Sequence, residues 1–173
     1  GGVSYPRLVI RREDLGPLAP RLASLPFGDK LNQFLYFRED PQRLESLWKG
    51  LTTDNTWSGP WGQTRAALRA GGDNRALTWV AHYRQTQMAG WANNADEVLA
   101  STKLDPQQRA RLRTDLAALC YMLTEPDFNP RGSMVHLGNP NMPINRFCAL
   151  PFAAALIPDH PQSKAWLDLS AEY

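Results

Sequence analysis

Three side chains suited to proton transfer and hydrogen bonding lie close together in the run from Arg131 to Pro143. They are His136, Asn139 and Asn141. An unperturbed histidine titrates near neutral pH and can act as a general base or acid. An asparagine amide offers two N–H donors without a competing charge. The run is rich in turn-forming residues, and loops hold binding and catalytic groups more often than helix faces do. We therefore look for a functional site here first.

Other candidates lie on the segments around this loop. Arg146 follows the loop closely, and Arg84 lies on an earlier helical segment. Either guanidinium suits bidentate pairing with a carboxylate. Tyr83 is a possible proton-transfer group if its helix faces a cleft. Trp61 and Trp91 belong to a set of six tryptophans, and such rings stack on sugars in carbohydrate-binding clefts.

Each candidate also has a structural interpretation. Asn139 precedes a proline in a common turn sequence, and Asn141 stands where a helix cap belongs. Tyr83 and Trp91 share a helical stripe, and such a stripe is core more often than cleft. His160, in an Asp-His-Pro sequence, suits a turn or cap. These alternatives remain open from the sequence.

Several kinds of chemistry lack their motifs. The three histidines stand in separate segments with no short-range ligand spacing, so we expect no metal site. The sequence has no P-loop, no GxGxxG and no GxSxG motif, which argues against nucleotide chemistry and the common serine hydrolases. We expect no cofactor.

The composition is that of an ordinary globular protein. The 173 residues are 43% hydrophobic and 21% charged, with a formal net charge of +2, and the length fits a single domain over residues 1–173. Scattered charges give no reason to expect nucleic acid as a partner, and no apolar run is long enough to cross a membrane. We interpret Arg109, Arg111 and Arg113 as one solvated helix face.

Apolar periodicity and caps predict an all-α protein built from antiparallel helical hairpins. Asp40-Pro41 and Asp105-Pro106 are strong helix starts. The helix after Pro41 is expected to have one apolar face, formed by Leu44, Leu47, Trp48 and Leu51. The helix after Pro106 is expected to have an apolar stripe, formed by Leu112, Leu116, Leu119, Cys120 and Leu123. Pro20 is expected to shorten or kink the first helix. Cys120 and Cys148 fall in apolar helical patterns and are more readily explained as buried thiols than as a disulfide. In chain order, we expect a helix that ends at residue 23, a helix over 41–51, a short helix that ends at residue 70 and a long helix over 75–100. Three more helices are expected over 106–125, over 143–156 and after residue 161.

The opening Tyr5-Pro-Arg-Leu-Val-Ile-Arg-Arg-Glu-Asp-Leu-Gly-Pro-Leu-Ala-Pro-Arg-Leu-Ala23 resembles the entry segment of heparinase II/III-like polysaccharide lyases. The tryptophan-rich helices, the run Tyr83-Arg84-Gln85-Thr86 and the asparagine-bearing loop before an apolar helix resemble the same family's α/α toroid. Complete toroids in that family are longer than this chain and precede a β-sandwich domain. The resemblance therefore implies the N-terminal part of an incomplete toroid, with the remainder of the same protein as a partner.

The resemblance also implies an activity. Lyases of this family cleave acidic, uronic-acid-containing polysaccharides by β-elimination and work in the periplasm or outside the cell. Asn139 or Asn141 would neutralise the substrate carboxylate, and His136 or Tyr83 would transfer the proton. The substrate would be held by Arg84, Arg146, Trp61 and Trp91.

Two other functions remain open from the sequence. One is a non-catalytic helical carbohydrate-binding or scaffold domain, in which His136, Asn139 and Asn141 bond to their own backbone. The other is a helical protein-interaction domain, which predicts that Trp57, Trp61, Trp79 and Trp91 are all buried.

Overall fold

The computed structural model describes residues 2–31, 34–52, 89–124 and 141–172, and every regular element in these ranges is helical. The expected all-α class is therefore confirmed for this part of the chain. Residues 89–100 form a helix that we call the central helix. The other helices are α1 (Arg12–Ala23), α2 (Gly28–Leu31), α3 (Pro41–Thr52), α6 (Pro106–Thr124), α7 (Asn141–Leu156) and α8 (Ser163–Ser170).

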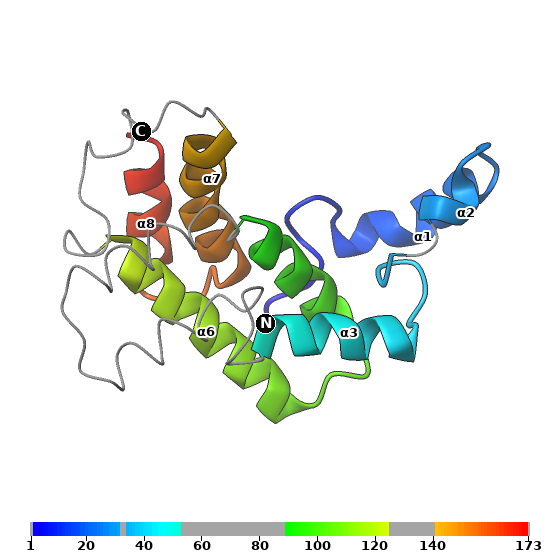
Figure 1. Ribbon diagram of the computed structural model, residues 1–173, viewed down its shortest axis with the longest axis horizontal. Helices are drawn as coiled ribbons and strands as arrows, with labels where there is room; N and C mark the ends of the chain where they lie inside the picture. The colour runs from blue at the N-terminus through cyan, green and yellow to red at the C-terminus, as the bar shows by residue number, and fades with distance from the viewer. Residues whose placement is uncertain (1, 32–33, 53–88, 125–140, 173) are drawn as a thin grey trace.

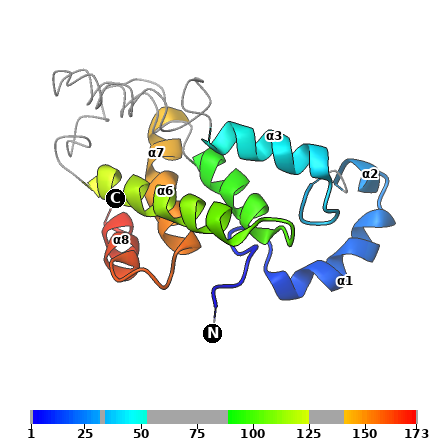
Figure 2. The same ribbon diagram turned by 90° about the horizontal axis from the view of Figure 1, so that it is seen from below.

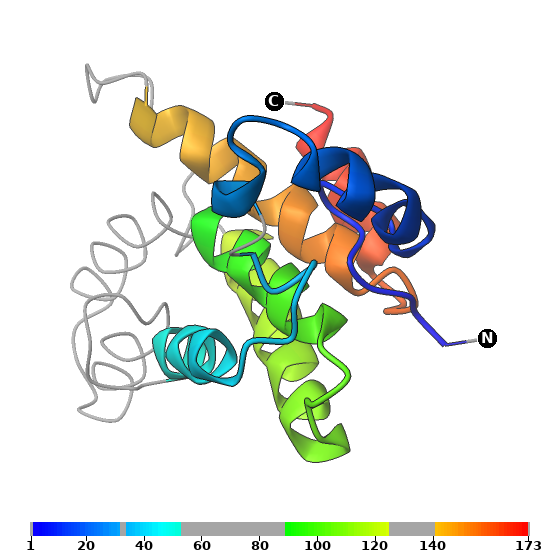
Figure 3. The same ribbon diagram turned by 90° about the vertical axis from the view of Figure 1, so that its right-hand side faces the viewer.

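The helices form a packed group with α1 and α2 at one end. Helix α7 packs against both α6 and α8, and Figure 1 shows α7 and α8 side by side at the end opposite α1 and α2. The central helix, drawn in green beside α6, runs through the middle of the molecule (Figure 2). Helix α3 lies along the flank of these two helices (Figure 3). None of the helices in the described residues is long and apolar enough to cross a membrane.

The core lies where the central helix, α6 and α7 meet. Removing leucine and isoleucine side chains of this kind from water stabilises the fold by about 1.5–3 kcal/mol each. The predicted apolar stripe of α6 is confirmed, because every member of it is buried. Its members are Leu112, Leu116, Leu119, Cys120 and Leu123.

Helix α3 begins as the sequence predicts. The Asp40 carboxylate accepts hydrogen bonds from the backbone N–H groups of Gln42 at 2.9 Å and Arg43 at 3.4 Å, which satisfies donors that a helix start leaves without intrahelical partners. These two bonds, the Arg43 bond above all, hold the pKa of Asp40 below its ordinary value. Leu51 is buried on the face that was expected to face the core.

Helix α1 continues past Pro20, which was expected to shorten or kink it. Pro17 and Pro20 both lie inside the helix, which ends at Ala23, so the predicted shortening at Pro20 is wrong. Proline removes the N–H that would bond to the carbonyl four residues earlier, here that of Gly16. Gly16 and Pro20 are both exposed, so water can donate a hydrogen bond to the carbonyl of Gly16. No side chain of α1 is buried.

The turn between α7 and α8 uses His160 as a structural residue, as its sequence context suggests. The Nδ1 atom of His160 accepts a hydrogen bond from the backbone N–H of Gln162 at 3.2 Å. Its ring stacks on Trp166, with 4.7 Å between the ring centroids. Nearby, Cys120 and Cys148 are both free thiols. Cys120 is buried as predicted, whereas Cys148 is only half-buried.

Candidate functional site

Five of the predicted site residues lie outside the part of the chain that the structure describes. They are Trp61, Tyr83, Arg84, His136 and Asn139. Their proposed roles remain predictions from the sequence.

Asn141 and Arg146 lie on the first turns of α7. The helix begins at Asn141 and continues to Leu156. The first N–H groups of a helix have no intrahelical acceptor, and the aligned peptide dipoles give this end a partial positive charge. Pro143 stands in this first turn, where a proline costs little because its missing N–H would have had no helical partner. The backbone that follows the candidate loop therefore favours negative charge.

Trp91 lies in the core. Only 5% of its surface is exposed, and its indole N–H donates to the backbone carbonyl of Leu51 at 3.4 Å. The ring fills the space between the central helix and the end of α3. It is not presented to a sugar in this arrangement.

The opening segment is bound to the central helix through one buried carboxylate. The backbone N–H of Arg7 lies 2.9 and 3.1 Å from the two oxygens of Asp96, and that of Leu8 lies 3.0 Å from Oδ2. The hydroxyl of Tyr36 donates to the same oxygen at 3.2 Å. Burial raises the pKa of Asp96, and the bonds from Leu8 and Arg7 partly offset this rise. Asp96 therefore fixes the opening segment against the central helix.

Tyr5 anchors the same segment at its other end. Its hydroxyl donates to the carbonyl of Leu156 at the end of α7 and accepts a hydrogen bond from Arg113 at 2.6 Å. Burial raises the pKa of Tyr5, although Arg113 opposes the rise. The tyrosine is therefore a neutral structural residue that joins the opening to α6 and α7.

Glu97, next to Asp96, binds the segment that leads into α3. Its carboxylate accepts hydrogen bonds from the Arg43 guanidinium through Nε at 2.5 Å and Nη2 at 2.8 Å. It also accepts one from the backbone N–H of Leu35. This paired geometry is strong for a carboxylate, and the bond to Glu97 raises the pKa of Arg43. The central helix thus fixes α3 through an ion pair with little exposure.

The interpretation of Arg109, Arg111 and Arg113 as one solvated face holds only for Arg111, which is exposed, whereas Arg109 and Arg113 are half-buried. Their guanidinium groups bond to carbonyls and a carboxylate on other elements, because these groups carry several donors that can satisfy helix ends. Their partners are Leu99 and Ser101 for Arg109, Thr52 for Arg111, and Asp159 besides Tyr5 for Arg113. The cluster holds helices together.

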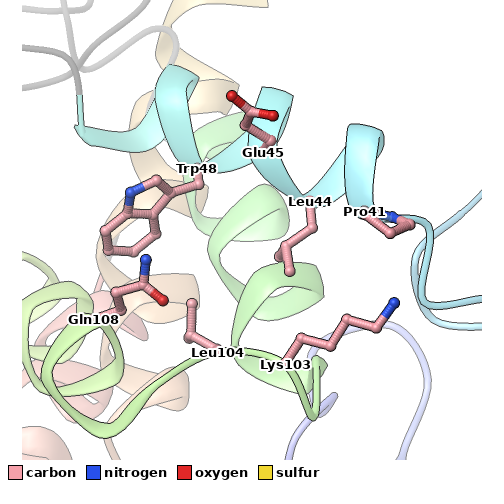
Figure 4. Close-up of a pocket in the computed structure, with 7 residues that line it drawn as sticks. All are labelled: Pro41, Leu44, Glu45, Trp48, Lys103, Leu104 and Gln108. Atoms are coloured by element: carbon pink, nitrogen blue, oxygen red, sulfur yellow. The ribbon is translucent and has the colours of Figure 1, made fainter.

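A groove of about 240 Å³ runs between α3 and the start of α6. Its lining is mainly apolar, with a few polar groups at the margins. The residues are Pro41, Leu44, Glu45, Trp48, Lys103, Leu104 and Gln108. Figure 4 shows Trp48 at one end and Lys103 at the other, with the two leucines between them. This is the arrangement of a small binding groove, with an aromatic wall and polar ends.

Two polar side chains that line the groove, Gln108 and Lys103, keep N–H donors that are available to a ligand. The Gln108 amide oxygen accepts a hydrogen bond from the backbone N–H of Asp105 at 3.2 Å, while its nitrogen points toward the Trp48 ring (Figure 4). The Lys103 ammonium has three donors, and one of them reaches the carbonyl of Glu39 at 2.5 Å. Glu45 pairs with Lys49 at 2.7 Å and points away from the groove.

No family model matches the chain, and no curated protein or solved structure is similar to it. Within the described residues, no group of three His, Cys, Asp or Glu side chains could hold a metal ion. The described residues hold the α3–α6 groove and a second hollow of about 220 Å³ between the opening segment and the end of the central helix.

The sequence interpretation missed Asp96, Glu97 and the groove. Two adjacent acidic residues stand between the apolar residues Ala95 and Val98 of a predicted helix, and that placement was the available signal, because buried charges are rarely left without partners. Trp48 was assigned only to the apolar face of its helix. Its partners in the groove come from residues 103–108, which no local pattern connects to α3.

Proposed function

We propose that this chain is the N-terminal helical part of a polysaccharide lyase that binds an acidic, uronic-acid-containing polysaccharide and cleaves it by β-elimination. The observation that carries the proposal is the start of α7 at Asn141. His136 and Asn139 precede this residue by a few positions in the sequence, so the chain after them enters the positive end of a long helix.

That position suits the difficult step of the reaction. Removal of the proton next to a uronate carboxylate builds negative charge on the carboxylate oxygens as an enolate forms. Preorganised N–H donors lower the barrier because they stabilise this charge where it develops. The amides of Asn139 and Asn141 supply such donors, and the N-terminus of α7 adds its partial positive charge. Arg146 is the proposed partner of a substrate carboxylate.

Proton transfer needs a base and an acid. His136 is the proposed base or acid, since its ordinary pKa lies close to neutral pH. Tyr83 is the proposed second group. The C5 proton passes to the base, the bond to the leaving glycosidic oxygen breaks, and that oxygen receives a proton. The product is an unsaturated uronate at the new non-reducing end.

The proposal takes the opening segment as part of the lyase architecture. Tyr5, Arg7 and Leu8 belong to the run that resembles the lyases, and all three have polar groups bound by distant elements. We propose an incomplete toroid of antiparallel hairpins that acts in the periplasm or outside the cell.

The test is ultraviolet absorbance by the unsaturated uronate during incubation with uronic-acid polymers. Heparan sulfate, hyaluronan, alginate and polygalacturonate cover the main linkages. An increase in absorbance that is lost in His136→Ala supports the lyase. No increase with any polymer, from the chain alone or from a longer protein containing it, contradicts the lyase.

The second candidate is a non-catalytic carbohydrate-binding or scaffold domain. Trp48 favours it, since its half-buried ring lines the groove between α3 and α6, whereas the burial of Trp91 agrees with the helical protein-interaction domain. A scaffold binds the polymer without producing the unsaturated uronate. Binding without elimination would therefore select this candidate.

A further inference from the structure

We propose, resting on the ligand class of the proposed function, that the groove between α3 and α6 is a separate binding subsite for one acidic sugar unit of the polysaccharide. The chemistry that recommends it is an aromatic wall at one end and an ammonium group at the other. An acidic sugar has the complementary pair, an apolar ring face and a carboxylate.

The aromatic wall is Trp48. The ring is half-buried, so one part packs on the core while the rest lines the groove (Figure 4). The guanidinium of Arg111 lies 6.0 Å from the ring centroid and also donates to the carbonyl of Thr52. These two contacts hold the ring in place before a ligand arrives, which reduces the ordering cost of binding.

The cationic group of the groove is Lys103. Its ammonium donates to one backbone carbonyl and keeps further N–H donors for a ligand carboxylate. Glu45 also belongs to the lining, and its carboxylate pairs with Lys49. Arg111 lies outside the lining, and its Nε lies 3.9 Å from the Asp115 carboxylate. The Lys103 ammonium therefore attracts a uronate more than a neutral sugar.

The walls of the groove are tied together by hydrogen bonds. The Glu39 carboxylate accepts from the Ser101 hydroxyl and, at 2.8 Å, from the Thr102 backbone N–H. These contacts join the entrance of α3 to the segment that carries Lys103. At the other end, the Arg111 bond to Thr52 joins α6 to the end of α3. The groove is therefore a fixed feature between two anchored walls.

Its size fits one ring of a polymer. A volume of about 240 Å³ lies below the range of roughly 300–1,000 Å³ typical of pockets for larger ligands. Leu104 is buried at the floor, while Pro41 and Lys103 are exposed. A chain could therefore extend beyond the groove after placing one ring in it.

The experiment follows the Trp48 indole N–H in ¹H–¹⁵N NMR spectra of the whole chain. The signal is assigned by its loss in Trp48→Phe, which keeps an aromatic ring in the core. The probes are tetrasaccharides of mannuronate, galacturonate, hyaluronan and heparan, with neutral cellotetraose for comparison. We expect at least one acidic tetrasaccharide to shift the signal and cellotetraose to leave it unchanged.

Two variants separate charge from general loss of structure. Lys103→Gln retains a donor for the Glu39 carbonyl but loses the charge, and should weaken binding about tenfold. Lys164→Gln removes an exposed lysine of α8 that pairs with Asp168, and should leave binding unchanged. Circular dichroism checks that all variants keep their helical content.

The outcomes distinguish this inference from the proposed function. An indole shift supports the subsite, and the absence of any elimination product from the chain and from a longer protein containing it contradicts the lyase. Elimination without a shift of the Trp48 signal by any acidic tetrasaccharide overturns the subsite and leaves the lyase. An equal response to cellotetraose, or equal affinity of Lys103→Gln and the unaltered chain, overturns the assignment to an acidic sugar.

Discussion

The carboxylate of Asp96 lies 2.9 and 3.1 Å from the backbone N–H of Arg7, although 89 residues of sequence separate the two. The contact fixes the opening segment against the central helix. The neighbouring Glu97 fixes the entrance of α3 through Arg43. Adjacent carboxylates on one helix thus position two segments that precede it by many residues.

Replacement of Asp96 by Asn should destabilise the protein strongly. An amide has one acceptor oxygen and brings two N–H groups, so it cannot accept all the hydrogen bonds from Arg7, Leu8 and Tyr36. We expect the free energy of unfolding to fall by about 3 kcal/mol. Urea unfolding followed by circular dichroism measures it. Asp29→Asn, at an exposed position of α2, is the control and should change stability by less than about 0.5 kcal/mol.

The Asp40 cap of α3 makes the stability of the folded protein depend on pH in a defined direction. The pKa of Asp40 is lower in the folded protein than in the unfolded chain, because the N–H groups of Arg43 and Gln42 bond to the carboxylate. The ionised Asp40 cap therefore contributes fully to the free energy of unfolding above the ordinary aspartate pKa of about 3.9. This contribution is lost as pH falls through the lower pKa of Asp40 in the folded protein.

The matched variant for this effect is Asp40→Asn. Asparagine caps a helix about as well as aspartate but does not titrate. Thermal unfolding at a series of acidic pH values should show the unaltered protein losing stability relative to the variant as pH falls. If the difference between the two proteins stays constant with pH, the predicted pKa shift of Asp40 is wrong.

Gly28 occupies a position where even a methyl group does not fit. A Cβ atom there would lie 2.3 Å from the carbonyl oxygen of Leu22 and 3.0 Å from Cα of Ala23. Gly28→Ala should therefore lower stability by about 1–3 kcal/mol, since backbone must move.

Gly50 is the comparison for this substitution. It lies inside α3, and a Cβ there meets nothing within 4 Å. Gly50→Ala should raise stability by up to about 1 kcal/mol because alanine favours the helix. Thermal melts of the two variants measure the contrast. Equal melting temperatures would show that the corner between α1 and α2 tolerates the added atom.

The two thiols should differ in reactivity. Burial raises the pKa of Cys120 to about 12, which removes the reactive thiolate at ordinary pH, and the side chain is fully covered. Cys148 is half-buried. Iodoacetamide at about pH 8 should modify Cys148 in the native protein and Cys120 only after unfolding, as peptide mass spectrometry can show. Equal rates at the two sites would contradict the placement of Cys120.

Local signals predicted much of the described fold. Asp40 and Asp105 mark helix starts through short-range capping, and the α6 stripe follows from helical periodicity. Both depend on neighbours within a few residues. They therefore can be read without knowledge of the tertiary structure.

The polar contacts between helices could not be predicted in this way. Arg113 was assigned to a solvated face, yet it bonds to Tyr5 and Asp159. Its partners lie 108 and 46 residues away, so no local spacing identifies them. The same holds for Asp96 and for the α3–α6 groove, whose two walls come from separate parts of the chain.

The proposed enzymatic role is tested most directly by ultraviolet absorbance at the wavelength of an unsaturated uronate, with the panel of acidic polymers as substrates. The account predicts an increase with at least one polymer, abolished in His136→Ala and in Asn139→Ala and retained in Lys164→Gln. Absence of any increase, or an increase that both loop variants retain, would contradict a β-elimination site in the loop before α7.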